Sequence, residues 1–485
     1  MSLRAALRRR FAVDSRALAA LRVSLAALVV LDLALRSRSL VAFYTDSGVL
    51  PRARLFEVAP TLGRLSLHAL SGAAWFQWAL FALTGVAAVA MLAGYRTTLA
   101  TLATGLLVVS LQYRNPLVLN SGDTLLRMLF LWAVFLPLGE RWSVDALRSA
   151  DHRTRVVSVA TAGLLLQVVA LYSVNAALKL RSDAWLSGEA VRYVFSLDMF
   201  VVGLGDVLAG HSGVLVTFSH LWLALVSLSV LLVALTGWPR AALAGAFAAM
   251  HLGMLATMQL GVFPLVSVAA LLPFLPSRAW DALPTRERVP GLRSVPVARW
   301  REALSTRLPV VALPDLPPAV AFVRERVVPV GLAVVLAGVL VWNAATVGAV
   351  PVPDAAPVDE SPDARWNMFA PSPLGTDYWF VAPAPLDSGE RVDAFDGGAV
   401  SWDKPPDVAD SYRSARWRKY LTNVQREDSP VISRGLAGHL CRRLEARGLD
   451  PQSVSVSAVA QPTRLGGPEP TEKKRIVERN CSVTG

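Results

Sequence analysis

Long apolar segments alternate with short basic or polar segments over the first three quarters of the chain. The length of each apolar segment is close to that of a transmembrane helix, which needs about 20 residues to cross the hydrocarbon core of a bilayer. They fall near residues 16–35, 72–94, 97–112, 123–138, 156–178, 212–236, 241–258, 261–276 and 328–348. The pattern predicts an all-α polytopic membrane protein with about eight to nine transmembrane helices. The exact number depends on whether residues 241–276 form two spans.

The pattern changes after residue 348, where the chain becomes polar and rich in Pro and Gly, with Trp residues spread among turn residues. We therefore expect residues 349–485 to form a small α+β domain. Residues 277–327 are rich in Pro and Arg and are predicted to form a basic cytoplasmic linker. This linker separates a transmembrane core, residues 1–276, from the last transmembrane helix, residues 328–348.

Composition supports a membrane protein rather than a soluble one. Of 485 residues, 54% are hydrophobic and 17% are charged, whereas soluble proteins carry about 25% charged residues. The net charge is 48 − 36 = +12, which in a soluble protein would suggest a nucleic-acid partner. Here the basic residues lie mainly between apolar segments, and no nucleic-acid-binding motif accompanies them. We therefore attribute the positive charge to membrane topology and expect no nucleic-acid partner.

The distribution of arginine predicts the orientation in the cytoplasmic membrane. An N-terminus inside the cell places the arginine-rich segments 139–155 and 277–327 in the cytoplasm, as the positive-inside rule requires. Segment 36–70, with five arginines, is the exception. The C-terminal domain then lies outside, where Cys441 and Cys481 could form a disulfide. The alternative is two unrelated cysteines that do not meet.

Lys179 is the only lysine among the first 403 residues, and it ends the fifth predicted span. Loss of hydration favours the neutral amine of a lysine, which can then act as a base. The simpler interpretation is an interfacial lysine that extends to water, with Trp185 in the aromatic belt. Position alone favours the simpler interpretation.

Other ionisable residues lie at the level of Lys179, toward the outer ends of their spans. Because ionisable groups are costly inside a membrane, several at one depth suggest a shared polar cavity that opens outward. A bound cofactor would then contact Asp123, Arg127, Trp185 and His220. The ionisable residues at this depth are Asp32, Asp123, Arg127, His220 and His251. The alternatives are a helical i,i+4 pair between Asp123 and Arg127 and histidines that only pack. No motif with metal-ligand spacing is present.

Several stretches, taken in order, resemble a known family. They are Asp14–Arg22 with Val30–Asp32, Tyr44–Pro51, Asn120–Asp123, Arg141–Leu147, Lys179–Gly188, the span of His251, Arg365–Pro371 and Arg416–Tyr420. Together they resemble the HTTM (horizontally transferred transmembrane) family, whose eukaryotic relative is vitamin K-dependent γ-glutamyl carboxylase. The last two stretches look like the C-terminal part of prokaryotic members.

The resemblance implies a mechanism. In the carboxylase a lysine deprotonates a reduced naphthoquinone, and oxygen and carbon dioxide then take part in the carboxylation of glutamate. Carried over, Lys179 would be the base, His251 would assist it, and a reduced menaquinone-type quinone would be the cofactor. A protein or peptide substrate would bind at the outer face. The carboxylase has adjacent lysines in this segment, whereas Leu180 follows Lys179 here.

Two other functions remain open at this point. The first is a non-enzymatic membrane factor that assists the export or maturation of a partner protein through its C-terminal domain. The second is a transporter, which the lack of a visible internal repeat disfavours.

Overall fold

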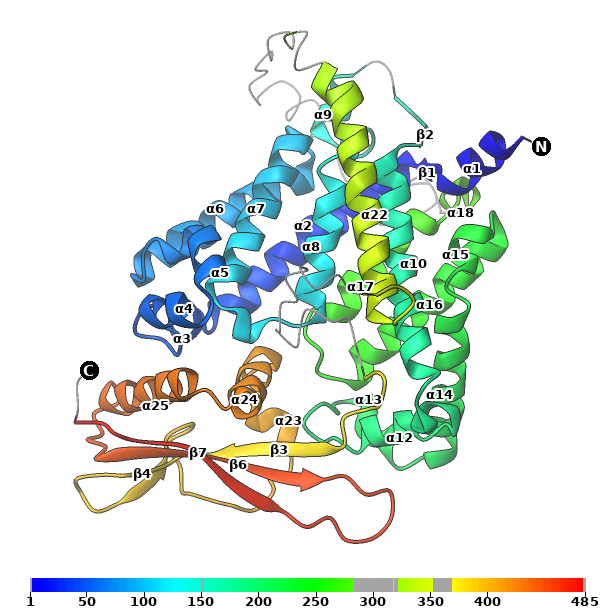
Figure 1. The fold of residues 1–485 in the computed structure, drawn as a ribbon. Helices are drawn as coiled ribbons and strands as arrows, with labels where there is room; N and C mark the ends of the chain where they lie inside the picture. Colours follow the sequence, from blue (N-terminus) through cyan, green and yellow to red (C-terminus); the bar gives the residue numbers. More distant parts are fainter. Residues whose placement is uncertain (1, 150–151, 283–316, 318–321, 352–368, 483–485) are drawn as a thin grey trace, which may run out of the picture.

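The structure is a computed structural model that describes residues 2–149, 152–282, 317, 322–351 and 369–482. The described part is mostly helical, with a small strand-containing region near the C-terminus (Figure 1). Much of the predicted linker 277–327 and the residues 352–368 of the predicted C-terminal domain lie outside the described residues. The predicted domain boundaries therefore stay predictions.

Helices occupy all the predicted spans. They are α2 (Ser15–Ser37), α6 (Ala74–Ala93), α7 (Thr97–Arg114), α8 (Ser121–Ala133), α10 (Val159–Lys179), α14 (Ser212–Ser227) with α15 (Leu231–Ala234), α16 (Trp238–Thr257), α17 (Phe263–Leu271) with the 3-10 turn η3 (Leu272–Phe274), and α22 (Val328–Thr346). The span expected at 212–236 is thus divided in two at residues 228–230. A π-helical turn, η5 (Val323–Val327), precedes α22.

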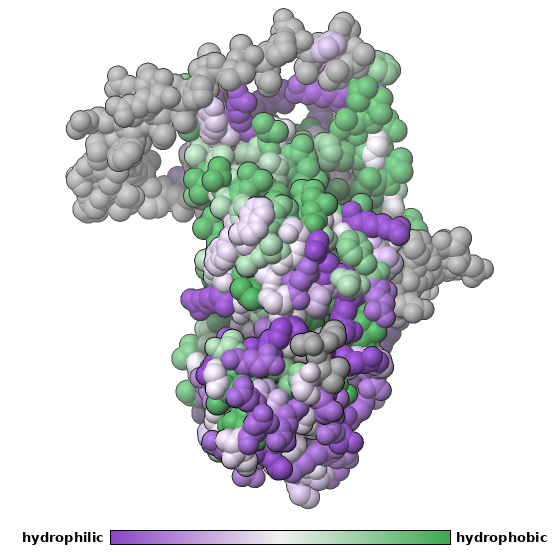
Figure 2. Space-filling model, turned by 90° about the vertical axis from the view of Figure 1, so that its left-hand side faces the viewer, coloured by the Kyte–Doolittle hydropathy of each residue, from purple (hydrophilic) through white to green (hydrophobic). Residues whose placement is uncertain are grey.

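Four helical segments of the described chain are long and apolar enough to cross a membrane. They are Ser15–Ser37, Ala74–Ala93, Val159–Lys179 and Val323–Thr346. Ser212–Ser227 and Phe263–Phe274 are apolar but shorter. The protein is therefore a membrane protein by its helices, while a total of eight to nine spans stays a prediction. Figure 2 shows an apolar band across the helical part and a more hydrophilic surface beyond it.

Local sequence explains where key helices begin and end. Asn120 caps α8 and forms a capping box with Asp123, and Ser158 caps α10 in the same way with Thr161. Gly94, with a φ of 68°, ends α6 and lets the chain turn into α7. The helix α2 lies at the centre of the bundle, where it packs against α6 and α17 and buries most of its apolar residues.

At the end of the bundle near the N-terminus, a strand pair and an ion pair join segments that are distant in the sequence. The strand β1 (Val13–Asp14) pairs with β2 (Arg155–Val156). Arg16 at the start of α2 forms an ion pair of 2.7 Å with Asp281 of α18 (Ser277–Asp281). The basic N-terminal helix α1 (Leu3–Phe11) and the turn α9 (Val144–Leu147) lie at this end as well (Figure 1).

The C-terminal region covers the opposite end (Figure 1). Its antiparallel sheet has the order β3 (Thr376–Val381), β6 (Ser453–Pro462) and β7 (Glu472–Asn480). A small hairpin pairs β4 (Pro383–Pro385) with β5 (Arg391–Asp393). The helices α24 (Ala415–Glu427) and α25 (Pro430–Glu445) lie between the sheet and the bundle, and a short helix, α23 (Val408–Ser411), precedes them.

Connections at this end of the bundle contact the C-terminal region directly. They contain α3 (Leu40–Tyr44), α4 (Arg52–Val58), α5 (Pro60–Leu65), η1 (Leu67–Ala69), η2 (Pro116–Val118), α11 (Asp183–Leu186), α12 (Ala190–Phe195) and α13 (Leu204–Ala209). Asn423 of α24 donates to the carbonyl oxygen of Leu117 at 2.9 Å. Arg54 of α4 donates to the carbonyl oxygen of Val431 in α25 at 3.2 Å. The bundle and the C-terminal region therefore share a packed, hydrogen-bonded interface.

Candidate functional site

Lys179 is completely enclosed at the end of α10. Its side chain has no solvent exposure. The Nζ atom lies 3.3 Å from the ring centroid of Trp185 and 5.2 Å from that of Trp222. Trp185 is fixed in turn, because its Nε1 donates to the carbonyl oxygen of Phe369 at 2.9 Å. The two indole faces thus hold the amine where bulk water does not reach it.

A tyrosine–histidine pair lies farther along the same face of α10. Tyr172, Asn175 and Lys179 follow one another at three- and four-residue spacing, which places them on one side of the helix. The Tyr172 hydroxyl and Nε2 of His251 are hydrogen-bonded at 2.8 Å. Nδ1 of His251 has no hydrogen-bond partner among the described residues. The pair can therefore pass a proton between the two side chains while the second ring nitrogen remains available.

A small cavity of about 20 Å³ lies beside the Tyr172–His251 pair. Such a volume holds about one water molecule. Its polar lining comes from Tyr172, Asn175, His251 and Ser267, and Trp222 and Phe263 close it on two sides. Trp222 also faces Lys179. The lysine and the cavity beside the Tyr172–His251 pair therefore border the same tryptophan side chain.

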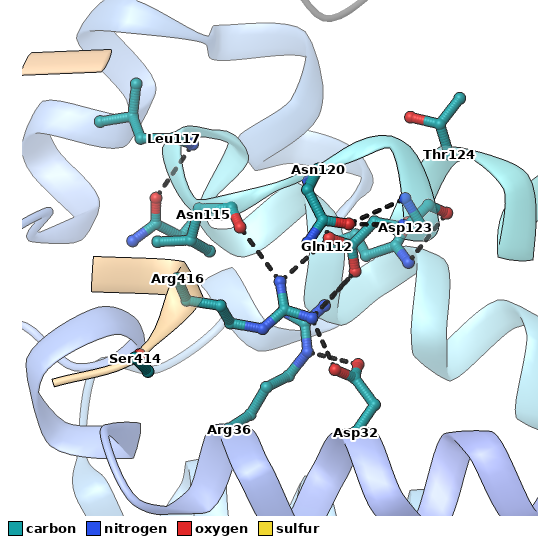
Figure 3. Close-up of polar contacts among 12 residues, drawn as sticks. Asp32, Arg36, Gln112, Asn115, Leu117, Asn120, Asp123, Thr124, Ser414 and Arg416 are labelled. Atoms are coloured by element: carbon teal, nitrogen blue, oxygen red, sulfur yellow. Dashed lines mark hydrogen bonds and ion pairs between the residues drawn. The ribbon is translucent and has the colours of Figure 1, made fainter. Parts of the chain in front are cut away.

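Asp123 belongs to a different cluster (Figure 3). Arg36 donates to Oδ2 of Asp32 at 2.6 Å and also to Asp123. Arg416 of α24 donates to Oδ1 of Asp32 at 2.5 Å and to Oδ2 of Asp123 at 3.0 Å. All four side chains are buried, and their two positive and two negative charges balance. This cluster joins α2 and α8 to the C-terminal region, so it is an ion network of the interface.

The comparison with known families assigns the chain. A family model described as the HTTM domain matches residues 12–280, more than half of the chain. The chain belongs to the HTTM family. That family is related to vitamin K-dependent carboxylase. No curated protein and no solved structure matches the chain.

Two of the expected site residues of this HTTM domain lie away from Lys179. Arg127 donates to Oγ1 of Thr124 at 3.4 Å, and its guanidinium lies 5.8 Å from the ring centroid of Tyr113. His220 is exposed, and one ring nitrogen lies 3.3 Å from the carbonyl oxygen of Leu186. The structure therefore brings Lys179 into contact with Trp185, and His251 lines a cavity that shares only Trp222 with that contact. Asp123, Arg127 and His220 make other contacts.

The two cysteines lie beyond the HTTM domain. Cys441 of α25 and Cys481, just after β7, form a disulfide that closes a 40-residue separation. It links α25 to the end of the edge strand β7. Among the described residues, no group of three or more His, Cys, Asp and Glu side chains could hold a metal ion.

Sequence reasoning did not single out several residues that build these sites. Tyr172 and Asn175 could have been predicted as neighbours of Lys179, because their spacing places all three residues on one face of a helix. Arg416 was part of a recognised stretch, but its partners are hundreds of residues away. Trp222 could not be assigned, because nothing in the local pattern separates it from an ordinary membrane-facing tryptophan.

Proposed function

We propose that this HTTM protein is a membrane enzyme in which Lys179 acts as a base toward an apolar, ring-containing substrate of the reduced-quinone class. The observation that carries the proposal is the complete enclosure of Lys179 between two indole rings. Intramembrane ionisable residues are costly and are usually retained for function. The relation of the HTTM family to vitamin K-dependent carboxylase supports the same chemistry.

The chain's own residues would each have a defined task. Lysine can release and accept a proton at Nζ, which arginine cannot do at ordinary pH. Trp185 and Trp222 would exclude water and hold Nζ in place. The hydrogen-bonded Tyr172 and His251 would relay a proton to or from the cavity.

A reduced naphthoquinone does not fit the cavity as it stands. The cavity has a volume of about 20 Å³, room for about one water molecule, and a two-ring molecule is several times larger. Trp222 or Phe263 would have to rotate before such a ring could contact His251. When bound, a reduced quinone would supply electrons to oxygen. The residues of the chain itself would handle only protons.

We further propose that the N-terminus faces the cytoplasm and the C-terminal region faces outward. The bundle end that carries α1, β2 and α18 contains the arginine-rich segments 4–10 and 141–155, as expected for a cytoplasmic face. The disulfide at the opposite end is typical of an oxidising compartment. A protein or peptide substrate, carboxylated with oxygen and carbon dioxide as co-substrates, would then approach from the outer side.

A second candidate function is a non-enzymatic factor for the export or maturation of a partner. The observation that favours it is the small cavity of about 20 Å³, which does not admit a two-ring quinone as it stands. In this case Lys179 would serve only to pack α10 against α11 and α14 through the two indole rings.

Epoxide formation from reduced menaquinone under oxygen separates the two functions. The purified protein, reconstituted in lipid, is compared with Lys179→Ala and with Lys474→Ala, an exposed lysine of β7. An enzyme should form epoxide in the wild type and in Lys474→Ala but not in Lys179→Ala. Absence of epoxide from folded wild type, even with glutamyl peptides and bicarbonate, would favour the maturation factor.

A further inference from the structure

A second, larger cavity lies between the bundle and the C-terminal region. Its volume is about 280 Å³. The bundle contributes Phe200 and Phe263, the segment before β3 contributes Phe369, and α24 contributes Arg418, Lys419 and Arg426. It is separate from the small cavity beside His251, although Phe263 lines both.

The charge of this larger cavity has one sign. Its lining contains three basic side chains and no Asp or Glu among the described residues. The N-terminus of α8 borders the cavity, but Asn120 and Asp123 already accept its hydrogen bonds. The attraction for an anion therefore comes from the side chains of α24.

Arg418 is the most constrained of the three cations. Only 5% of its surface is exposed. Its guanidinium donates to the carbonyl oxygen of Met199 at 2.7 Å and to the side-chain and main-chain oxygens of Gln259 at 2.9 and 2.5 Å. It also lies 4.2 Å from the ring centroid of Phe200. Burial lowers the pKa of Arg418 to about 10.

Neutral oxygens thus hold Arg418 in place. The carboxylate of Asp377 favours its charged form from farther away, but that carboxylate is itself paired with Lys404 at 3.3 Å. No described carboxylate lies within ion-pair distance of its guanidinium. A buried cation without a direct ion-pair partner is unfavourable. An anion in the adjoining cavity would remove this cost.

The rest of the lining is apolar and aromatic. Phe200 and Phe369 pack edge-to-face with 5.8 Å between their centroids, and both border the cavity. Phe200 belongs to the connection between α12 and α13 and Phe369 to the segment before β3, whereas the cations belong to α24. The described lining of the cavity therefore combines cationic and apolar side chains, which suits a molecule with a charged head and an apolar body.

We propose that this cavity binds an amphiphile with a phosphate head group. The phosphate would lie against Arg418, Lys419 and Arg426, and the apolar part against Phe200, Phe263 and Phe369. Three basic side chains suit the several acceptor oxygens of a phosphate better than a single carboxylate. Membrane phospholipids carry such head groups at this level of a bilayer.

Thermal unfolding of the full chain in a neutral detergent tests this site. The probes are dioctanoyl phosphatidylglycerol, dioctanoyl phosphatidylcholine and inorganic phosphate. We expect phosphatidylglycerol to raise the unfolding temperature. The double variant Lys419→Gln/Arg426→Gln should need at least about tenfold more lipid for the same rise, because it loses charge-assisted hydrogen bonds to the phosphate.

Two further variants make the test specific. Lys474→Gln/Arg475→Gln removes the same charge from exposed positions of β7 and should respond like the wild type. Ala415→Trp fills the cavity without changing its charge and should abolish the response even if the double variant fails to fold.

Several outcomes would overturn the proposal. An equal response to phosphatidylcholine would show that the head-group charge is not recognised. An equal response to inorganic phosphate at the same concentration would show a free-anion site rather than a site for an amphiphile. An undiminished response in Ala415→Trp would place the lipid elsewhere. Because no readout involves Lys179 or quinone turnover, this test is independent of the proposed enzymatic function.

Discussion

Arg416 and Asp32 form an ion pair of 2.5 Å although 384 residues separate them in the chain. The pair joins α24 of the C-terminal region to the central helix of the bundle. Together with Arg36 and Asp123 it forms a buried group of balanced charge. The position of α24 therefore depends on charges that lie in the HTTM domain.

Replacing Arg416 should loosen the C-terminal region. Removal of one partner from a buried ion pair leaves the others uncompensated and costs about 3–5 kcal/mol. We expect Arg416→Gln to lower the unfolding temperature strongly and to speed the hydrogen exchange of residues 415–427. Arg434→Gln, an exposed position on α25, is the matched control. An unfolding temperature equal to that of the control would show that the network adds nothing to stability.

Loss of the disulfide should destabilise the C-terminal region. A cross-link across a 40-residue separation restricts the unfolded chain, and its removal costs on the order of 2–4 kcal/mol. We expect Cys441→Ser to lower the unfolding temperature, and reductant to lower that of the wild type but not of the variant. Two titratable thiols in purified, unreduced protein would contradict the disulfide.

His439 should make stability depend on pH. Burial lowers the pKa of His439 to about 4, helped by Arg442 and Arg413 and opposed by a hydrogen bond with the carbonyl oxygen of Ser47. The unfolded chain, with a pKa of about 6.5, binds a proton first as the pH falls. His439 therefore has no effect above pH about 6.5, and destabilises the folded protein progressively as the pH falls toward about 4.

The loss in the free energy of unfolding that His439 causes should reach about 3 kcal/mol at pH 4, because each unit of difference in pKa corresponds to about 1.36 kcal/mol. Unfolding midpoints of the wild type and His439→Gln, measured between pH 7 and pH 4, would show it as a smaller loss in the variant. Parallel pH profiles would mean that His439 does not titrate with unfolding.

The hydrophobic pattern was sufficient to locate the helices but not their interruptions. Continuous apolar segments near 16–35 and 156–178 coincide with α2 and α10. The helix expected at 212–236 is broken near Ser229, whose hydroxyl is hydrogen-bonded to that of Ser173 on α10. This contact joins two segments that are distant in the sequence. The periodicity of apolar residues within one segment therefore cannot predict it.

The candidate site was predictable only where its residues are close in sequence. Lys179 and Trp185 are six positions apart, and the structure places them in contact. Asp123 was considered as a helical partner of Arg127, but Arg36 and Arg416 bind its carboxylate instead. Those cations come from distant segments, and a buried charge pairs with whatever the fold brings next to it.

Tyr172 should matter for turnover more than for stability. Tyr172→Phe removes the hydroxyl that is bonded to His251 and keeps the ring that packs 4.4 Å from Phe247. General acid–base groups contribute about 10²–10⁴-fold to rate, so we expect quinone-dependent turnover to fall at least about tenfold with little change in unfolding temperature. Tyr193→Phe serves as the control. Equal turnover in Tyr172→Phe and Tyr193→Phe would show that Tyr172 serves only in packing.

Substitution of Lys179 by arginine tests whether Lys179 acts as the base: the variant is Lys179→Arg. Arginine stays protonated at ordinary pH and cannot act as a base. Because its larger, charged side chain must fit a completely enclosed site, we expect a folded protein with a lowered unfolding temperature. In lipid vesicles supplied with reduced menaquinone and oxygen, this variant should form no quinone epoxide. Epoxide formation by Lys179→Arg at the wild-type rate would contradict the role of Lys179 as the base.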